Sequence, residues 1–285
     1  MTIDASIFQG LSWNVASDVR QLFLYHFMVN ALEAGTAAAV MAGAIGWFMV
    51  LRRQTFAGHT LAVIAFPGAA GATLVGLPLA LGYFGACAAG ALALAGVSAD
   101  RSGSHSRESA ATGTVQAFGL GIGFLFVQLY HELLNGLQAL LFGTFLGISD
   151  AQARTLVAVA AATLAVLAFG ARPLFFASVD VDVARAAGVP VRALSFGFLL
   201  LLGLAVAATS QITGALLVFA LLVTPAATAH RLTARPLAGL ALSVGLGLAV
   251  TWVGLALAYF SIYPVGFWVT SLSFAVYVAV RVLRR

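Results

Sequence analysis

The chain has 285 residues, of which 62% are hydrophobic and only 8% are charged, and its mean hydropathy is +1.04. A soluble domain carries about 25% charged residues, so this composition excludes a soluble globular protein and predicts a protein of the lipid bilayer. The formal charge of +5 comes from arginine without any lysine, which excludes a phosphate-binding P-loop, because that loop requires a lysine.

The arginines lie mostly at the ends of apolar runs, and this placement indicates membrane topology and not nucleic-acid binding. Any ATP-driven activity therefore needs a separate ATPase chain, and we do not expect this chain to be an enzyme. Cys87 is the only cysteine, which excludes an intrachain disulfide and a thiolate metal cluster. We expect no permanently bound cofactor.

The first 21 residues are amphipathic and lack the basic and then apolar regions of a signal peptide. Residues 22–285 form a succession of apolar runs, which we interpret as one transmembrane domain. A spanning helix needs about 20 apolar residues, and nine runs approach that length: 22–51, 59–79, 80–99, 111–130, 155–171, 194–212, 213–229, 237–260 and 265–283. A further run, 133–148, is too short to cross easily and reads as re-entrant. The predicted fold class is an all-α polytopic membrane bundle of eight or nine spanning helices.

Charged residues inside apolar runs are candidates for function, because each costs roughly 2.5 to 3.5 kcal/mol on insertion scales. Glu33 is such a residue in the first run, and Asn30 and His26 precede it by three and seven residues. These spacings place all three on one face of a helix, where they could line a cation path. Alternatively, His26 and Asn30 lie at the membrane boundary and leave Glu33 alone inside.

His59 opens the second run, in a segment that also contains Gly58, Pro67 and Gly68. Proline and glycine leave backbone carbonyls free, and such irregular backbone is tolerated where it faces a cavity. Imidazole is a ligand for zinc and other borderline divalent metals, so His59 is a candidate metal ligand. The alternative is a boundary histidine at a helix start, with its polar groups satisfied.

Arginine placement also predicts the orientation, because cytoplasmic loops collect positive charge. If all nine runs cross, every arginine-bearing connection from Arg52 onward falls on one side, except the one with Arg154. The carboxyl terminus is then cytoplasmic and the amino terminus lies outside. With eight crossings, both termini would be cytoplasmic.

The segment 172–194 is the longest charge-bearing interruption in the second half of the chain, and it falls on the cytoplasmic side. Asp180 and Asp182 suit the first turn of a helix, while Gly188 and then Pro190 prevent its continuation. The pattern predicts a helix of about two turns that projects from the membrane. A motor protein could bind this helix; alternatively, it is an ordinary solvated helix in a loop between two spans.

Five stretches, in the right order, resemble segments of the metal-uptake ABC permeases, the ABC-3 family of zinc, manganese and iron importers. They are 27–54 (FMVNALEAG through WFMVLRRQ), 58–68 (GHTLAVIAFPG), 141–149 (LFGTFLGIS), 179–191 (VDVDVARAAGVPV) and 211–231 (QITGALLVFALLVTPAATAHR). The resemblance covers nearly the whole chain after residue 21.

The resemblance implies the membrane subunit of an ATP-driven importer of divalent metal ions, zinc or manganese, in the cell membrane. Its implied partners are an ABC ATPase subunit, an extracytoplasmic solute-binding protein and a second copy of itself, so that two copies enclose one path. In importers of this kind, the segment similar to 179–191 forms the coupling helix seated on the ATPase. This implies a coupling role for Asp180, Asp182, Ala184, Arg185 and Gly188.

The chain departs from the family pattern in the second helix, where the family usually has an Asp and a His four residues apart. The matching positions here are His59 and Val63, so the resemblance implies a transient site with one imidazole per copy and Glu33 as the nearest spare carboxylate. Two copies of each would supply the four ligands typical of zinc. A nitrogen ligand in place of a carboxylate mildly favours zinc over manganese.

The main alternative is a secondary transporter that works on an ion gradient without an ATPase. Such a protein needs coupling carboxylates within its spans and often has inverted repeats. Only Glu33 qualifies, and no repeat is visible in the sequence. A structural membrane subunit without a transport path fits the composition but not the projecting cytoplasmic helix.

Overall fold

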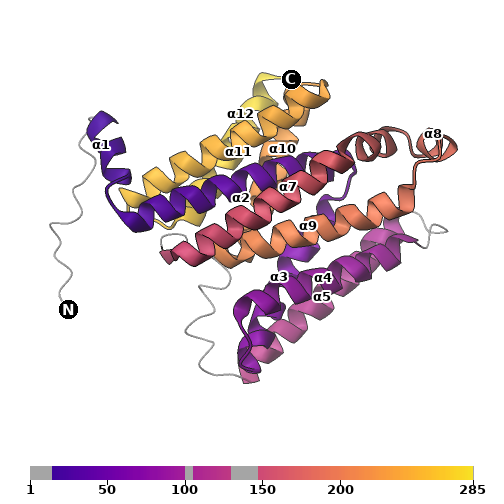
Figure 1. Ribbon diagram of the computed structural model, residues 1–285, viewed down its shortest axis with the longest axis horizontal. Helices are drawn as coiled ribbons and strands as arrows, with labels where there is room; N and C mark the ends of the chain where they lie inside the picture. Colours follow the sequence, from indigo (N-terminus) through magenta and orange to yellow (C-terminus); the bar gives the residue numbers. More distant parts are fainter. Residues whose placement is uncertain (1–14, 100–104, 130–146, 285) are drawn as a thin grey trace.

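The computed structural model describes residues 15–99, 105–129 and 147–284, and the regular structure within these ranges is helical. The chain forms a bundle of long helices (Figure 1). The helices are α1 (Val15–Leu22), α2 (His26–Leu51), α3 (Thr55–Leu74), α4 (Leu79–Ala99), α5 (His105–Leu129), α7 (Asp150–Val179), α8 (Val181–Ala186), α9 (Val191–Thr213), α10 (Ala215–Leu232), α11 (Pro236–Tyr259) and α12 (Val265–Leu283).

Eight helices of the described ranges are long and apolar enough to cross a membrane. The apolar part of α10, Leu217–Leu232, is shorter than these eight. Each of the nine predicted runs coincides with one long helix, so the predicted all-α membrane bundle is confirmed. The predicted re-entrant run, 133–148, lies almost entirely outside the described residues, as do the first 14 residues of the amphipathic amino-terminal segment.

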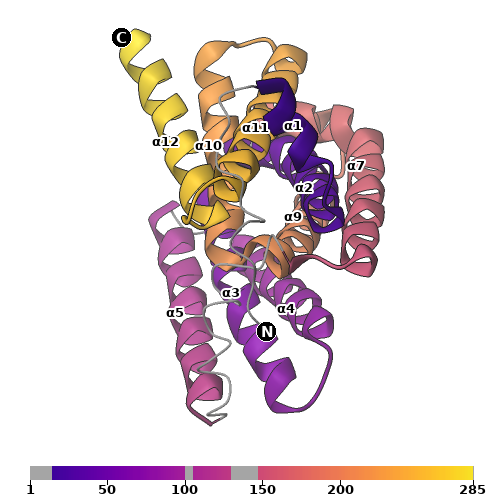
Figure 2. The ribbon, with the colours of Figure 1, turned by 90° about the vertical axis from the view of Figure 1, so that its left-hand side faces the viewer.

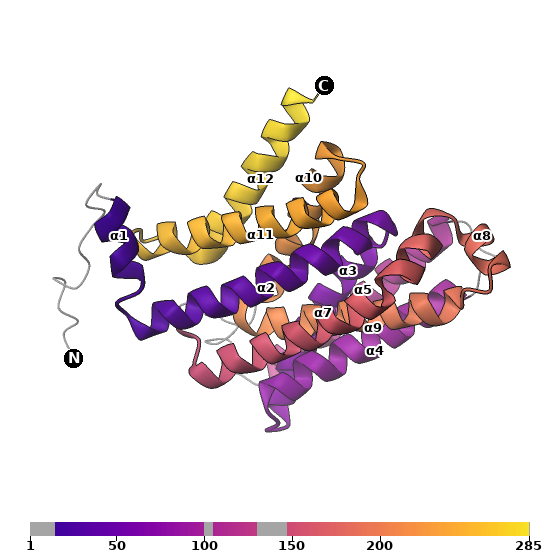
Figure 3. The same ribbon diagram turned by 45° about the horizontal axis from the view of Figure 1, so that its top comes forward.

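The largest boundary difference is at α7, which has 30 residues although the apolar run predicted only 155–171. Its start is extended by a capping box: the Ser149 hydroxyl accepts from the Gln152 N–H at 3.3 Å, and the Gln152 side chain accepts from the Ser149 N–H at 3.0 Å. At the other end the helix continues through Pro173, which removes one backbone hydrogen bond and bends a helix. The bend is visible in Figure 3.

Helix α2 is the central helix of the bundle and packs against α7, α9, α10 and α11. Figure 2 shows α3, α4 and α5 grouped on one side of it and α10, α11 and α12 on the other. Glycines permit the close approach that membrane helices use. A Cβ on Gly46 would meet the carbonyl oxygen of Leu222 in α10, and one on Gly43 would meet the backbone of Val244 in α11.

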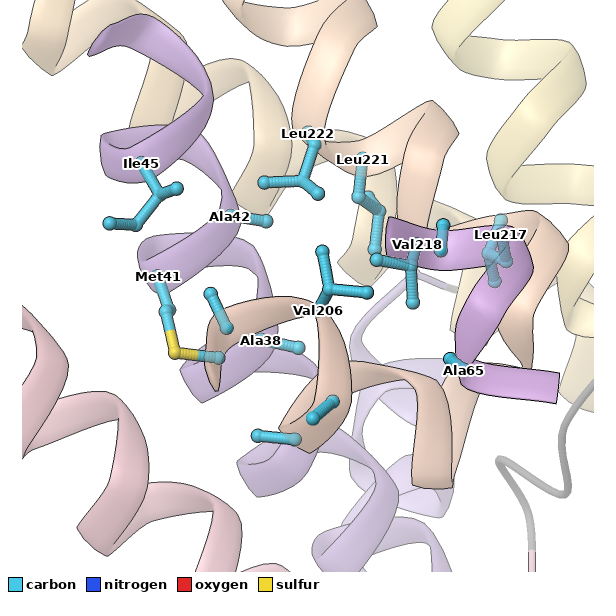
Figure 4. Close-up of a cluster of buried hydrophobic side chains, with 14 of the residues drawn as sticks. Ala38, Met41, Ala42, Ile45, Ala65, Val206, Leu217, Val218, Leu221 and Leu222 are labelled. Carbon is cyan, nitrogen blue, oxygen red and sulfur yellow. The ribbon is translucent and has the colours of Figure 1, made fainter. Parts of the chain in front are cut away.

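The core lies where α2, α3, α9 and α10 meet. Buried aliphatic side chains from these four helices interdigitate there (Figure 4), among them Met41, Ile45, Val206 and Leu221. On the α3–α4 side of the bundle, Cys87 is completely buried, and its thiol donates a hydrogen bond to the Leu61 carbonyl at 3.7 Å. The apolar contacts of the core between α2, α3, α9 and α10 hold α2 and α10 against each other.

Candidate functional site

The projecting helix predicted from the sequence is α8, a six-residue helix at one end of the bundle (Figure 1). Asp180 forms its amino-terminal cap, because one carboxylate oxygen accepts from the N–H groups of Asp182 and Val183 at 3.0 and 2.9 Å. Gly188 follows the helix with φ +81°, a conformation that glycine adopts without strain. The local signals in the sequence thus specify both ends of α8.

The inner face of α8 is fixed to the helices on either side of it. Ala184 is completely buried, in a small apolar cluster with Ala177 of α7 and Val191 of α9. This cluster is separate from the main core, so the end of α7, α8 and the start of α9 form one packed unit. We call this unit, residues 174–195, the handle.

The outer face of α8 is open. Val181 and Val183 are 38% and 52% exposed, and Asp182 and Arg185 form an exposed ion pair at 3.1 Å. An exposed pair of this kind adds little to folding stability. Apolar side chains flanked by both signs of charge on a rigid support are a surface on which a second protein can dock.

His59 lies one turn inside α3 and is half-buried. Its ring centroid is 4.7 Å from that of Phe219 in α10, at 60° to it. Its Nδ1 atom is buried and has no hydrogen-bond partner among the described residues. An unpartnered buried nitrogen has lost hydration without replacement, so this imidazole has a free ligand position between α3 and α10. Val63, one turn further along α3, supplies no second ligand.

Two of the three polar residues near the start of α2, His26 and Asn30, have a hydrogen-bond partner among the described residues, and the third, Glu33, does not. His26 and Asn30 both contact one carboxylate oxygen of Asp150, the first residue of α7: His26 Nε2 lies 2.8 Å from it, and Asn30 Nδ2 donates to it at 2.7 Å. Glu33 is exposed and makes no hydrogen bond or ion pair with the described residues. Only Glu33 of these three α2 side chains is left free for an ion or for a second copy.

Sequence reasoning missed Asp150, which links the starts of α2 and α7. The capping box at Ser149 was a detectable signal for a helix start there, but the contact with His26 joins residues 124 positions apart, which no local pattern shows. Among the described residues, no group of three His, Cys, Asp or Glu side chains could hold a metal ion. A metal site within the described part of one chain would therefore lack a third ligand of these types.

Comparison with known proteins gives one family and several relatives. The model of the ABC 3 transport family matches residues 24–284. The manganese import system permease protein ScaB of Streptococcus parasanguinis is 29% identical, with 82% of each chain covered. The manganese transport system membrane protein MntC of Halalkalibacterium halodurans is 28% identical over 85% of this chain and 81% of the relative.

A solved structure, PsaBC from Streptococcus pneumoniae in complex with Fab, contains a chain that superimposes with a TM-score of 0.82. Its sequence is 26% identical, and the match covers 93% of this chain and 95% of that one. The similarity therefore extends over nearly the whole chain, and it agrees with the eight apolar helices of the described residues in identifying a multi-pass protein of the cell membrane.

Proposed function

Because this chain belongs to the ABC 3 transport family, we propose that it is the membrane subunit of an ATP-driven importer for a divalent transition-metal ion. The observation that carries the proposal is the handle: a capped helix, packed on its inner side and open on its outer side, projects between two spanning helices. Such a helix can transmit force only if a partner binds it. In this proposal the partner is a separate ABC ATPase, since the chain has no lysine for a nucleotide-binding loop.

The transported ion passes a transient site formed by two copies of the chain. His59 offers an unpartnered ring nitrogen, and one imidazole is too few ligands for a divalent ion. A homodimer would double the number of imidazoles. The exposed carboxylate of Glu33 lies near the opposite end of α2 from the turn that leads to His59, so it is free to attract a cation to the path but does not join the His59 site. Weak, shared coordination suits a conduit, because an ion that is held tightly is not released.

An extracytoplasmic solute-binding protein would deliver the metal. The relatives are named for manganese import, which supports manganese as the substrate. The nitrogen of His59 and the absence of a partner at Val63 favour zinc instead, because imidazole suits zinc while carboxylates suit manganese. Both metals therefore belong in a test of this function.

The first experiment measures uptake of radioactive manganese and zinc into proteoliposomes that contain the permease, its ATPase and the delivery protein. Uptake should require ATP hydrolysis. The variant with both Asp182→Ala and Arg185→Ala should insert and dimerise normally but lose most ATP-driven uptake, because the exposed pair adds little to stability.

His59→Ala should reduce uptake at limiting metal by about tenfold or more, in the range seen when metal sites lose one supporting group. Glu33→Gln should reduce it less.

Other outcomes would contradict parts of this proposal. Uptake that follows an imposed ion gradient and ignores ATP would indicate a secondary transporter. Unchanged uptake of both metals by His59→Ala would show that the path does not coordinate the ion, and selectivity would then lie in the delivery protein.

A further inference from the structure

Arg52 connects the central helix to both sides of the handle. It is the carboxyl-terminal cap residue of α2, and it is half-buried between three helices. Its Nη1 donates to the Ser178 hydroxyl at 3.1 Å, and its Nη2 donates to the Ser195 hydroxyl at 2.8 Å. Ser178 lies in the last turn of α7 and Ser195 in the first turns of α9, so one guanidinium group spans the base of the handle.

The remaining contacts of Arg52 leave little freedom for its side chain. Its Nε donates to the Gln54 side chain at 3.2 Å, and its guanidinium carbon lies 5.4 Å from the centre of the Phe198 ring in α9. The Ser178 hydroxyl donates in turn to the Leu174 carbonyl, so its oxygen lone pairs face the arginine. The fixed fork of guanidinium donors matches this arrangement, and a lysine ammonium does not.

No carboxylate pairs with Arg52 in the described part of the chain. The charge is therefore held by neutral hydroxyls, an amide and an aromatic face, although removing a cation from water is costly. If only stability were required, apolar residues at this junction would serve as well. A half-buried cation without a carboxylate partner, placed where α2, α7 and α9 meet, suggests a role beyond packing.

The turn after Arg52 leads directly to the proposed metal ligand. The Gln54 N–H donates to the Met49 carbonyl and the Arg53 N–H to the Val50 carbonyl, at 2.9 and 3.0 Å. These two bonds are those of a Schellman motif, so backbone hydrogen bonds close the turn between α2 and α3. Helix α3 begins at Thr55, and His59 lies in its second turn.

We propose that Arg52 is the positioning residue that transmits movement of the handle to α2 and to the His59 end of α3. In this scheme the ATPase moves α8, the packed handle moves as one unit, and the two serine contacts carry that displacement to α2. The inference deepens the proposed function and rests on it. Arg52 touches neither the metal nor nucleotide; it acts through the helices that it joins.

Arg53 provides a matched control, because it carries the same charge at the next position. It is exposed, and its side chain makes no hydrogen bond with the described residues. The experiment measures metal uptake and ATP hydrolysis in parallel for the wild type, Arg52→Gln, Arg52→Lys, Arg53→Gln and the double variant Ser178→Ala with Ser195→Ala. The quantity compared is metal transported per ATP hydrolysed.

We expect Arg52→Gln and the double serine variant to bind the ATPase and hydrolyse ATP at near the wild-type rate while the metal transported per ATP falls about tenfold. Arg52→Lys should retain part of the wild-type metal transported per ATP, because lysine keeps a cationic donor but lacks the two separate guanidinium donors that reach Ser178 and Ser195. Arg53→Gln should retain the wild-type ratio. Combining Arg52→Gln with the two serine changes should cause no further loss, because all three residues form one connection.

The opposite results would overturn the proposal. If Arg52→Gln lowers hydrolysis and uptake in equal proportion together with the melting temperature, Arg52 has a structural role only. If the metal transported per ATP is unchanged in Arg52→Gln and in the serine variant, the contacts do not transmit movement. A wild-type complex that moves no metal with ATP would instead overturn the proposed function, and the coupling role with it.

Discussion

At the scale of single residues, the partner of a polar side chain on α2 depends on which distant helix packs against it. His26, Asn30 and Glu33 share one side of α2, as their spacing predicts, yet the first two bind Asp150 and the third does not. Helical spacing defines the side of a helix, whereas the neighbour on that side depends on packing between segments more than a hundred residues apart. The contacts of Arg52 could not be predicted for the same reason, since its serine partners lie 126 and 143 positions away.

Gly46 gives a residue-scale prediction. A Cβ there would lie 2.0 Å from the Leu222 carbonyl oxygen, which is backbone and cannot rotate away. Gly46→Ala should therefore force α2 and α10 apart and destabilise the protein by about 1–3 kcal/mol, the usual cost of overpacking. Thermal unfolding in detergent measures this.

Gly245→Ala is the matched control for that experiment. This glycine lies in α11, and nothing stands within 4 Å of its added Cβ. The alanine should be neutral or raise stability by up to about 1 kcal/mol, because it restricts the unfolded chain and favours the helix. Equal melting temperatures for the Gly46 variant and the wild type would contradict the close packing of α2 on α10.

At the scale of elements, α8 could be predicted because its signals are local. Asp180 before the helix and Gly188 with Pro190 after it specify the limits without help from the rest of the fold. Helix α7 could not be bounded in the same way, since Pro173 normally predicts an end. The helix continues past it because Leu174 and Ala177 are buried against neighbouring elements, and that burial is invisible in the sequence.

Asp180 gives the prediction at this scale. Asp180→Ala removes the acceptor for two N–H groups of α8 and should cost about 1 kcal/mol, the typical worth of a helix cap. A helix of six residues has few other bonds, so α8 should fray and ATPase binding should weaken. Asp180→Asn, which keeps a capping oxygen, should retain most of that binding. Affinity of the purified permease for the ATPase is the measurement, and equal loss in both variants would show that the charge matters and the cap does not.

At the scale of the whole molecule, the end of the bundle at which the arginine-bearing connections lie predicts the orientation of the protein in the membrane. The turn after α2, the handle and the turn before α11 gather at one end of the bundle (Figure 1), and arginines mark each of them: Arg52, Arg53, Arg185 and Arg235. Helices α5 and α7 end and begin, respectively, at the other end of the bundle. The sequence predicts eight or nine crossings. In the structure α10 has the short apolar stretch, and it follows directly on α9 at Gly214.

A reporter fused after Arg285 tests the orientation. We expect cytoplasmic activity, because positively charged connections remain inside. A green fluorescent protein fusion should fluoresce, and an alkaline phosphatase fusion at the same site should be inactive. The reverse pattern would place the handle outside the cell, where the proposed ATPase could not bind it.

The complete burial of Cys87 has a practical consequence for spectroscopy. The chain has no other cysteine, and this one is enclosed between α3 and α4, where its thiol donates a hydrogen bond to the Leu61 carbonyl. Thiol-reactive spin labels should therefore not react with the native protein and should attach only to an introduced cysteine, for example in place of the exposed Val183. Pulsed electron resonance between such labels on two protomers would then record how far the two handles separate during a nucleotide cycle, without first replacing a core residue.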